Sequence, residues 1–264
     1  LVRVAQAIRR GNPNAYIVAG GLAHFWPDDT QTLGFLRGML AMNAGNTFDA
    51  LSYTGYGVWG ANDRLVRKAQ HLRAVLAEFG LDAMPLIAAE VGLTCTGQNE
   101  CPPDFVHIQT EYASRVFAEA VMWKIDTVAW YTLSLPGADP YWHSLITTAD
   151  GGVQPTPAFY ALRNSLRLLE QAQPLGPPPE LPDDAGAGNH VLGFQTPRGL
   201  LYVVWNQQSQ ALPAWIPVMP GARVVCIDQL GLAEPRVADC SSQVHDGLLF
   251  VEPGDTRYIE VFAP

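Results

Sequence analysis

Hydrophobic residues in the first 173 positions fall into two alternating patterns. Short continuous apolar runs, typical of parallel strands that are covered on both faces, lie at 15–21, 48–53, 84–89 and 127–131. Apolar residues recur every three or four positions, as on one side of a helix, over 29–43, 62–79, 104–124 and 157–171. Strands that alternate with helices of this length indicate parallel βαβ units. We therefore expect four parallel strands with connecting helices over residues 1–173.

The chain also opens within a helical pattern. Leu1, Val4, Ala5 and Ile8 share one face of this helix, and the nearby arginines lie off that face. No capping residue stands before the helix, so we expect further sequence to precede Leu1. A mature N-terminus produced by processing is the alternative.

The pattern changes after residue 173. Residues 174–188 contain five prolines and three glycines, which is too many breakers for a helix or strand and predicts a linker. Beyond the linker, short apolar runs follow one another without an intervening helix, which predicts an antiparallel β-sandwich over 189–264. These runs lie at 191–195, 200–205, 214–218, 223–228, 248–251 and 258–262.

Composition and charge exclude several classes of ligand. The 264 residues include 16 Lys and Arg against 25 Asp and Glu, for a net charge of −9. Nucleic acid and anionic membrane surfaces require clustered positive charge, so we expect neither as a partner. No apolar run approaches the ~18 residues of a membrane span. The chain has no Cys-x-x-Cys motif, no histidines at metal-ligand spacing and no phosphate-binding glycine loop, so no cofactor and no metal is expected.

The four cysteines fall into two local pairs. The simplest connectivity joins Cys95 to Cys101 and Cys226 to Cys240. The second pair would stabilise the predicted sandwich, which has too few residues to be held together by its hydrophobic core alone. Disulfides predict an extracellular or cell-surface location, and free thiols in a cytosolic protein are the alternative.

One apolar run ends in a lone carboxylate. Residues 85–89 are all apolar, and Glu90 follows them, with Gly92 close behind. A charge at the end of a buried strand lies where the strand stops being covered. In a (β/α) barrel that end of the strand faces the active site. A solvated residue that opens a loop is the alternative interpretation of Glu90.

Four segments, in this order, carry a family resemblance: Asn12–Gly21, Phe48–Gly57, Leu86–Gly92 and Val128–Tyr131. Together they resemble strands five to eight, the second half of a clan A glycoside hydrolase barrel. The following β region, with Leu201–Asn206 and Asp228–Gly231, is similar to the sandwich of family 39-like bacterial enzymes. The resemblance implies an α/β fold: the second half of a TIM (β/α)8 barrel plus an all-β antiparallel sandwich domain. Its parts would be a barrel portion over 1–173, from helix 4 to helix 8, a linker over 174–188 and a sandwich over 189–264.

The resemblance also implies catalytic roles. Retaining glycosidases use two carboxylates about 5 Å apart, a nucleophile and a general acid/base. By resemblance, Glu90 is the nucleophile, Tyr56 donates a hydrogen bond to it, and Trp130 forms an apolar floor for a sugar ring. Packing roles for the two aromatic residues are the alternative. Further candidates for substrate contacts in the loops after the strands are His24, Trp26, Trp59 and Trp142.

Departures from the family pattern limit what this chain can do. The family's acid/base glutamate follows an asparagine at the end of strand four, which would lie upstream of Leu1. The Asn99–Glu100 pair lies in the expected Cys95–Cys101 loop, and Thr54 and Ala89 replace polar residues that relatives commonly carry.

We therefore predict a fragment or subunit of a retaining glycoside hydrolase. It would act on β-linked oligo- or polysaccharide and would be inactive alone. Its missing N-terminal half-barrel would come from the same gene or from another chain. The alternative is a non-catalytic glycan-binding or structural protein derived from such a barrel.

Overall fold

The computed structural model describes residues 1–23, 30–42, 44–58, 64–94, 102–134, 144–147, 152–179, 189–206, 214–230, 237–251 and 256–264. The chain divides into two compact units. Unit 1 comprises Leu1–Gly57, Asp63–Gly92 and Trp123–Tyr131. Unit 2 comprises Val58–Asn62, Leu93–Met122 and Thr132–Pro264.

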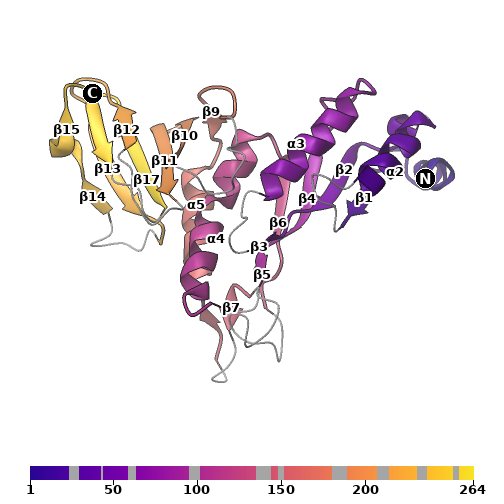
Figure 1. The fold of residues 1–264 in the computed structure, drawn as a ribbon, viewed down its shortest axis with the longest axis horizontal. Helices are drawn as coiled ribbons and strands as arrows, with labels where there is room; N and C mark the ends of the chain where they lie inside the picture. The colour runs from indigo at the N-terminus through magenta and orange to yellow at the C-terminus, as the bar shows by residue number, and fades with distance from the viewer. Residues whose placement is uncertain are drawn as a thin grey trace. The chain divides into compact units, whose positions relative to one another are not determined.

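Unit 1 contains a parallel sheet whose four strands lie side by side in chain order (Figure 1). The strands are β1 (Val18–Leu22), β2 (Ala50–Thr54), β4 (Leu86–Val91) and β6 (Thr127–Trp130). The helices in the described part of this unit are α1 (Val2–Gly11), α2 (Thr30–Ala41), the 3-10 helix η1 (Ala44–Thr47) and α3 (Arg64–Ala77). This arrangement agrees with the parallel βαβ order expected from the sequence.

The sheet of unit 1 has one covered face and an opposite, open face on which three of its four strands expose residues, whereas β2 is buried on both faces. On the covered face, the hydroxyl of Tyr53 donates a hydrogen bond of 3.1 Å to the carbonyl of Leu65 on α3. Successive side chains of a strand point to opposite faces, and accordingly Ala19 is 2% exposed whereas Val18 is 44% exposed. We define the open face by residues on three of the strands: Val18, Gly20, Ala89, Thr127 and Ala129, all exposed.

A glycine pair ends strand β1. Gly20 has a φ of +112°, and a Cβ at this position would lie 2.5 Å from the carbonyl oxygen of Ser52. The backbone N–H of Gly21 donates to the hydroxyl of Ser52 over 3.0 Å. Only glycine permits this conformation and this close approach without strain.

Two side chains hold the loops that lead into the strands of unit 1. Asp49, just before β2, accepts hydrogen bonds from the backbone N–H of Ile17 (2.7 Å) and from Arg9 (2.8 Å). The bond from Ile17 and then the interaction with Arg9 hold the pKa of Asp49 below its usual value. On α3, the guanidinium of Arg73 donates to the carbonyl oxygens of Asp82, Met84 and Lys124.

Unit 2 combines α4 (Phe105–Met122) and α5 (Pro157–Leu168) with antiparallel sheets. The larger sheet has the strand order β14-β13-β17-β11-β10-β9, and the smaller has the order β12-β16-β15. Their strands are β9 (Gln173–Pro174), β10 (Asn189–Thr196), β11 (Gly199–Asn206), β12 (Ala214–Pro217), β13 (Arg223–Asp228), β14 (Val237–Asp239), β15 (Val244–His245), β16 (Leu248–Val251) and β17 (Arg257–Phe262). The remaining short elements in the described part of the chain are β3 (Gly57–Val58), β5 (Leu93–Thr94), β7 (Ile146–Thr147), β8 (Gln154–Pro155) and η2 (Ser241–Gln243).

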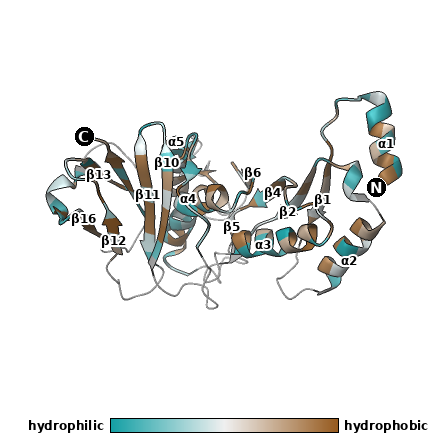
Figure 2. Cartoon of the chain, turned by 90° about the horizontal axis from the view of Figure 1, so that it is seen from above, coloured by the Kyte–Doolittle hydropathy of each residue, from teal (hydrophilic) through white to brown (hydrophobic). Residues whose placement is uncertain are grey.

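The two antiparallel sheets share one hydrophobic core. Val204 and Ile259 of the larger sheet belong to the same buried cluster as Ile216 and Leu249 of the smaller sheet. The strands that supply these residues carry much of the hydrophobic colour in Figure 2, whereas α3 and α4 show both colours. A disulfide joins Cys226 of β13 to Cys240, the pairing expected from the sequence for this half of the chain.

Helix α4 packs against the larger sheet within unit 2. The buried hydroxyl of Tyr258 donates to the carbonyl of Ser114, and the carboxylate of Glu111 accepts from the backbone N–H of Thr256 over 2.7 Å. The guanidinium of Arg115, which is 1% exposed, lies 5.5 Å from the ring centroid of Trp205. These contacts place α4 in the same compact unit as the antiparallel strands.

The strands and helices expected from the sequence are observed within a few residues of their expected ranges, whereas β14, β15 and the other short elements were not expected. Two differences are informative. Strand β4 continues through Glu90 to Val91, so the carboxylate belongs to the strand itself. Gln173 and Pro174 pair with Phe194 and Gln195 of β10, so a strand includes the first residue of the expected linker. Residues 180–188 of that linker lie outside the described residues.

Candidate active site

Glu90 lies at the carboxyl end of β4, a central strand of the parallel sheet. The pairing of β2 with β4 joins Tyr53 to Ala88 and then Thr54 to Glu90, which leaves Ala89 as an extra residue. Such bulges redirect a side chain and are common beside active sites. The carbonyl of Glu90 accepts a 2.7 Å hydrogen bond from the N–H of Gly55, which ties the end of β4 to the segment after β2.

Tyr56 contacts the carboxylate of Glu90 directly. Its hydroxyl donates a 2.7 Å hydrogen bond to Oε2 of Glu90, across 34 positions of sequence. Burial, followed by this hydrogen bond and the charge of Glu90, raises the pKa of Tyr56 well above the ordinary tyrosine value. The phenol therefore keeps its proton throughout the physiological pH range and remains a hydrogen-bond donor to the carboxylate.

Tyr131 adds a second aromatic ring to this cluster. It follows β6 directly, is 42% exposed, and meets the ring of Tyr56 edge-on at 6.3 Å between centroids and 81° between planes. Sequence reasoning did not single out Tyr131. The feature of the sequence that could have identified Tyr131 is the two-residue period of β6, because this period places Tyr131 on the same side of the strand as the exposed Thr127 and Ala129.

Trp130 lies on the other, more buried side of β6. Its Cα partner is Val91, which is fully buried, and the burial of β6 alternates between exposed and intermediate positions. The structure thus brings Glu90, Tyr56 and Tyr131 together and places Trp130 one residue away in the strand. The role of Trp130 as a floor for a sugar ring stays a prediction.

A buried lysine supports the strand beside Glu90. Lys68 of α3 is 3% exposed and donates a 2.9 Å hydrogen bond to the carbonyl of Thr54, the register partner of Glu90. Desolvation, followed by the charge of Arg64, lowers the pKa of Lys68 to about 8. Sequence reasoning missed Lys68 because a lysine within a helix pattern gives no sign of its burial.

The other expected site residues lie outside the described residues: His24, Trp26, Trp59, Trp142, Cys95 and Cys101. Among the described residues, no group of three or more His, Cys, Asp or Glu side chains could hold a metal ion. The described helices include none long and apolar enough to cross a membrane.

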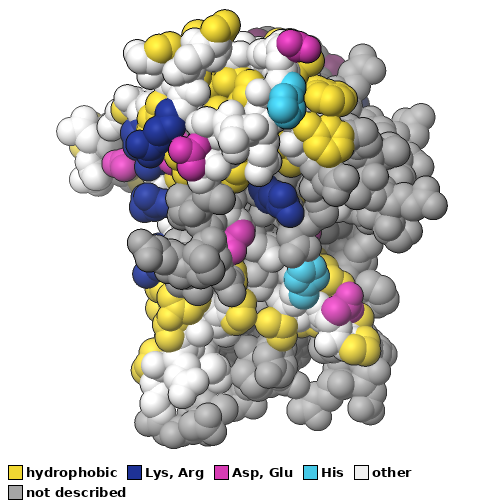
Figure 3. Space-filling view, turned by 90° about the vertical axis from the view of Figure 1, so that its left-hand side faces the viewer, with side chains coloured by type: hydrophobic (Ala, Val, Ile, Leu, Met, Phe, Trp, Pro, Cys, Tyr) yellow, Lys and Arg dark blue, Asp and Glu magenta, His cyan; other side chains and the backbone are white. Residues whose placement is uncertain are grey.

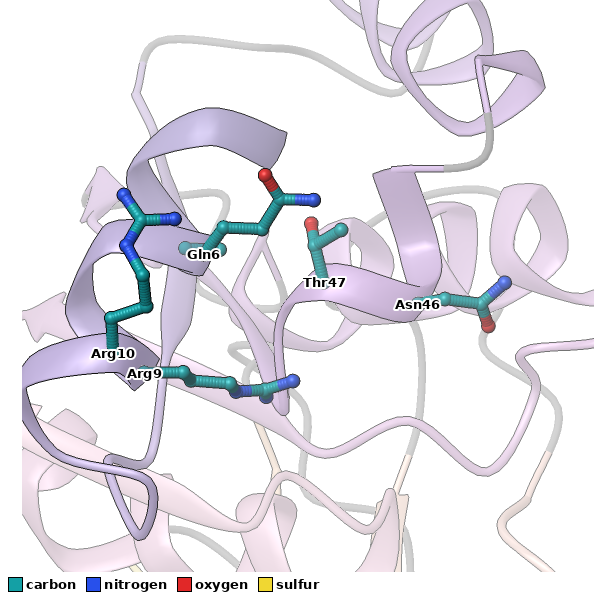
Figure 4. A pocket seen from close by; sticks show the side chains of 6 residues that line it. Gln6, Arg9, Arg10, Asn46 and Thr47 are labelled. Atoms are coloured by element: carbon teal, nitrogen blue, oxygen red, sulfur yellow. The ribbon is translucent and has the colours of Figure 1, made fainter.

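A pocket of about 450 Å³ lies elsewhere in unit 1, between α1 and η1. Its lining includes Gln6, Arg9 and Arg10 of α1 and Asn46 and Thr47 of η1 (Figure 4). Arg9 already forms an ion pair with an aspartate just before β2, so this pocket adjoins the amino end of that strand. Glu90 and Tyr56 belong to the opposite, carboxyl ends of the strands.

The comparisons with known proteins identify the fold. No protein-family model matches the chain. No curated protein sequence matches it significantly. Among solved structures, the chain is similar to a GH30 endoxylanase from Clostridium papyrosolvens C71, with a TM-score of 0.56, 12% identity and coverage of 96% of this chain and 57% of that one.

Two further solved structures have the same kind of likeness. The α-L-arabinofuranosidase from Thermotoga maritima has a TM-score of 0.58 and 14% identity, over 100% of this chain and 58% of the other. A β-porphyranase of glycoside hydrolase family 86 from Bacteroides plebeius has a TM-score of 0.60 and 13% identity, over 100% and 51%. The chain thus spans just over half the length of these structures, and it shares its fold with glycoside hydrolases.

Proposed function

We propose that this chain carries the nucleophile half of the active site of a retaining glycoside hydrolase. The observation that carries the proposal is the carboxylate of Glu90, held by Tyr56 at the carboxyl end of a central parallel strand. Barrel enzymes place catalytic groups at that end of their strands. The fold likeness to glycoside hydrolases supports the same assignment.

The four parallel strands are, in this proposal, strands five to eight of a (β/α)8 barrel. Their chain order and their open face, with exposed Val18 and Ala89, support it. In a closed barrel, side chains from all of the strands fill the inward face, so four further strands would cover the face that these four leave open. The other half-barrel comes from upstream sequence of the same gene or from another chain. Residues 189–264 then form the appended β-sandwich, to which β9 (Gln173–Pro174) adds an edge strand before the linker.

In the first chemical step, a carboxylate oxygen of Glu90 attacks the anomeric carbon and forms a covalent glycosyl-enzyme intermediate. The hydroxyl of Tyr56 holds the other oxygen in place and stays protonated. A general acid from the upstream half protonates the leaving group and then activates the water that releases the sugar. Tyr131, exposed beside Tyr56, offers a ring that can contact the bound sugar.

The substrate is a β-linked oligo- or polysaccharide. The Cys226–Cys240 disulfide supports an extracellular location.

A trapping experiment tests this proposal. The protein that includes the upstream half is incubated with a panel of 2-deoxy-2-fluoro aryl β-glycosides, which accumulate the covalent intermediate of retaining enzymes, and the labelled peptide is identified by mass spectrometry. We expect the adduct on Glu90, and we expect Glu90→Ala to abolish both labelling and hydrolysis. The 264-residue chain alone should not hydrolyse the panel.

Labelling of a different carboxylate, or undiminished turnover by Glu90→Ala, would refute the assignment. Binding of glycans without any turnover by the complete protein would instead favour a non-catalytic glycan-binding protein. A non-catalytic role would explain why this chain lacks the polar residues that relatives carry at the positions of Thr54 and Ala89.

A further inference from the structure

The three-stranded sheet of unit 2 is apolar on both of its faces. Its inner face supplies Ile216, Leu249 and Val251 to the core shared with the larger sheet. On its outer face, Trp215 is 56% exposed and Phe250 is 37% exposed. An antiparallel sheet that covers a core on one side normally presents polar residues to water on the other. The apolar residues on this exposed outer face are therefore unusual.

The two aromatic residues form one platform. Trp215 of β12 and Phe250 of β16 are direct cross-strand partners, and their rings pack at 5.1 Å between centroids with 65° between planes. Pro217 and Leu248, the next outward pair, are also exposed. His245 of β15 stands across from Leu248 and is exposed. We call these five residues, Trp215, Pro217, His245, Leu248 and Phe250, the outer patch.

The size of the outer patch suits a ligand that contacts a small area of the surface better than it suits a second protein. A free aromatic side chain offers roughly 150–250 Å², so the exposed fractions of Trp215 and Phe250 amount to on the order of 200 Å². The exposed Leu248, Pro217 and His245 add to this area. A stable dimer buries about 800 Å² per partner. The largest exposed apolar patch of a typical monomer measures about 300–600 Å² and is often functional.

The chemistry of the outer patch points to a neutral, partly apolar ligand. None of its five residues is Asp, Glu, Lys or Arg, although the chain as a whole has a net charge of −9. A pyranose ring has one face of C–H groups that stacks on an indole or phenyl ring, and a rim of hydroxyls that an imidazole can bind. Figure 3 shows one face of the molecule, on which hydrophobic side chains lie beside each of two histidines and acidic side chains lie near both.

We propose that the outer patch is a binding site for neutral polysaccharide, separate from the cluster around Glu90. It stacks sugar rings on Trp215 and Phe250, and His245 hydrogen-bonds to sugar hydroxyls. This proposal rests on the proposed function, because the bound chain is of the same chemical class as the substrate of the hydrolase. A second site of this kind raises the local concentration of the polymer around the protein.

Affinity gel electrophoresis of the 264-residue chain tests the proposal. Glu90→Gln is the background, and the gels contain soluble wheat arabinoxylan, barley β-glucan or, as the anionic comparison, polygalacturonate. We expect retardation by at least one of the two neutral glycans and none by polygalacturonate. Trp215→Ala and Phe250→Ala should each weaken the apparent affinity about fivefold or more, whereas Trp215→Phe should keep most of it.

Phe35→Ala is the matched control, because Phe35 is an aromatic residue of α2 that is 66% exposed and lies outside the outer patch. Circular dichroism melts should show that the outer-patch variants remain folded. The proposal is overturned if Trp215→Ala binds as tightly as the background, or if neither neutral glycan retards the chain. It is also overturned if Trp215→Ala changes only the oligomeric state in sedimentation, which would identify the outer patch as a contact between copies.

The outcome of the affinity electrophoresis does not depend on the outcome of the trapping experiment. Retardation that depends on Trp215, together with no covalent adduct on Glu90, would leave the binding site standing and remove the catalytic proposal. An adduct on Glu90 without retardation would do the reverse.

Discussion

The substitution Arg73→Ala should destabilise unit 1 strongly, because one guanidinium holds the loops before two strands. Arg73 donates to the carbonyls of Asp82 (2.9 Å) and Met84 (2.5 Å) just before β4, and to Lys124 (2.7 Å) just before β6. Its Nη2 also lies 3.7 Å from the carboxylate of Asp126, which itself accepts from the first N–H of β4. The side chain is 25% exposed.

The magnitude follows from the number and setting of these bonds. A hydrogen bond from a charged donor contributes about 1.5–3 kcal/mol. Water can replace the guanidinium at part of this site, so we expect the three lost bonds to cost about 2–4 kcal/mol of unfolding free energy in total. Arg73→Lys should fall between the wild type and Arg73→Ala, because an ammonium lacks the planar fork of donors.

A second arginine of unit 1 provides a matched control. Arg37 on α2 forms two hydrogen bonds of 2.6 and 2.8 Å with the carboxylate of Glu78, but both side chains are nearly half exposed. Solvent and salt screen exposed ion pairs, which contribute little to stability, so Arg37→Ala should cost much less than Arg73→Ala. Urea unfolding of the 264-residue chain, followed by far-UV circular dichroism, measures both variants in the same unit. An Arg37→Ala cost equal to or above that of Arg73→Ala would refute this reasoning.

Three further predictions concern stability and its pH dependence. The double variant Cys226→Ala/Cys240→Ala should lose about 3 kcal/mol in urea unfolding under oxidising conditions, because the bond closes a loop of 14 positions; equal midpoints for the wild type with and without reductant would contradict this. The lowered pKa of Asp49 stabilises the fold above the unfolded-state pKa and is lost as pH falls through the folded-state pKa. The difference in unfolding free energy between wild type and Asp49→Asn should therefore shrink on acidification below about pH 4, and a difference that is constant with pH would count against it. For Lys68, whose pKa is lowered to about 8, the unfolded chain keeps its proton to higher pH, so wild-type stability should rise relative to Lys68→Met between about pH 8 and 10; parallel pH curves for the two proteins would show that Lys68 is not held in this environment.

Some features of the candidate site were accessible from the sequence because they depend on short-range patterns. The apolar run over 84–89 and the carboxylate after it predicted a buried strand with Glu90 at its carboxyl end, and β4 (Leu86–Val91) has this arrangement. The placement of Tyr56 near Glu90 came from the family resemblance, and the structure joins the two by a hydrogen bond. The Cys226–Cys240 pair was predictable from its short separation.

Other features depend on how distant segments register against one another. The extra residue at Ala89 arises from the pairing of β4 with β2, and a one-residue change in register reverses which face a side chain occupies. The edge-on contact between the rings of Tyr56 and Tyr131 likewise joins segments that are far apart in the chain. No pattern within β6 alone identifies the partner of either ring.

The sequence by itself determined the order and type of the elements, because the period of hydrophobic residues reflects which neighbours along the chain share a covered face. Only the tertiary structure decided that α4 packs with the antiparallel strands in unit 2, that Arg73 joins the loops before β4 and β6, and that Trp215 and Phe250 form one exposed platform. Each of these depends on contacts between residues far apart in the chain. A residue's hydrophobicity favours burial but does not specify the partner that covers it, and at the outer patch the described structure leaves Trp215 and Phe250 in contact with solvent.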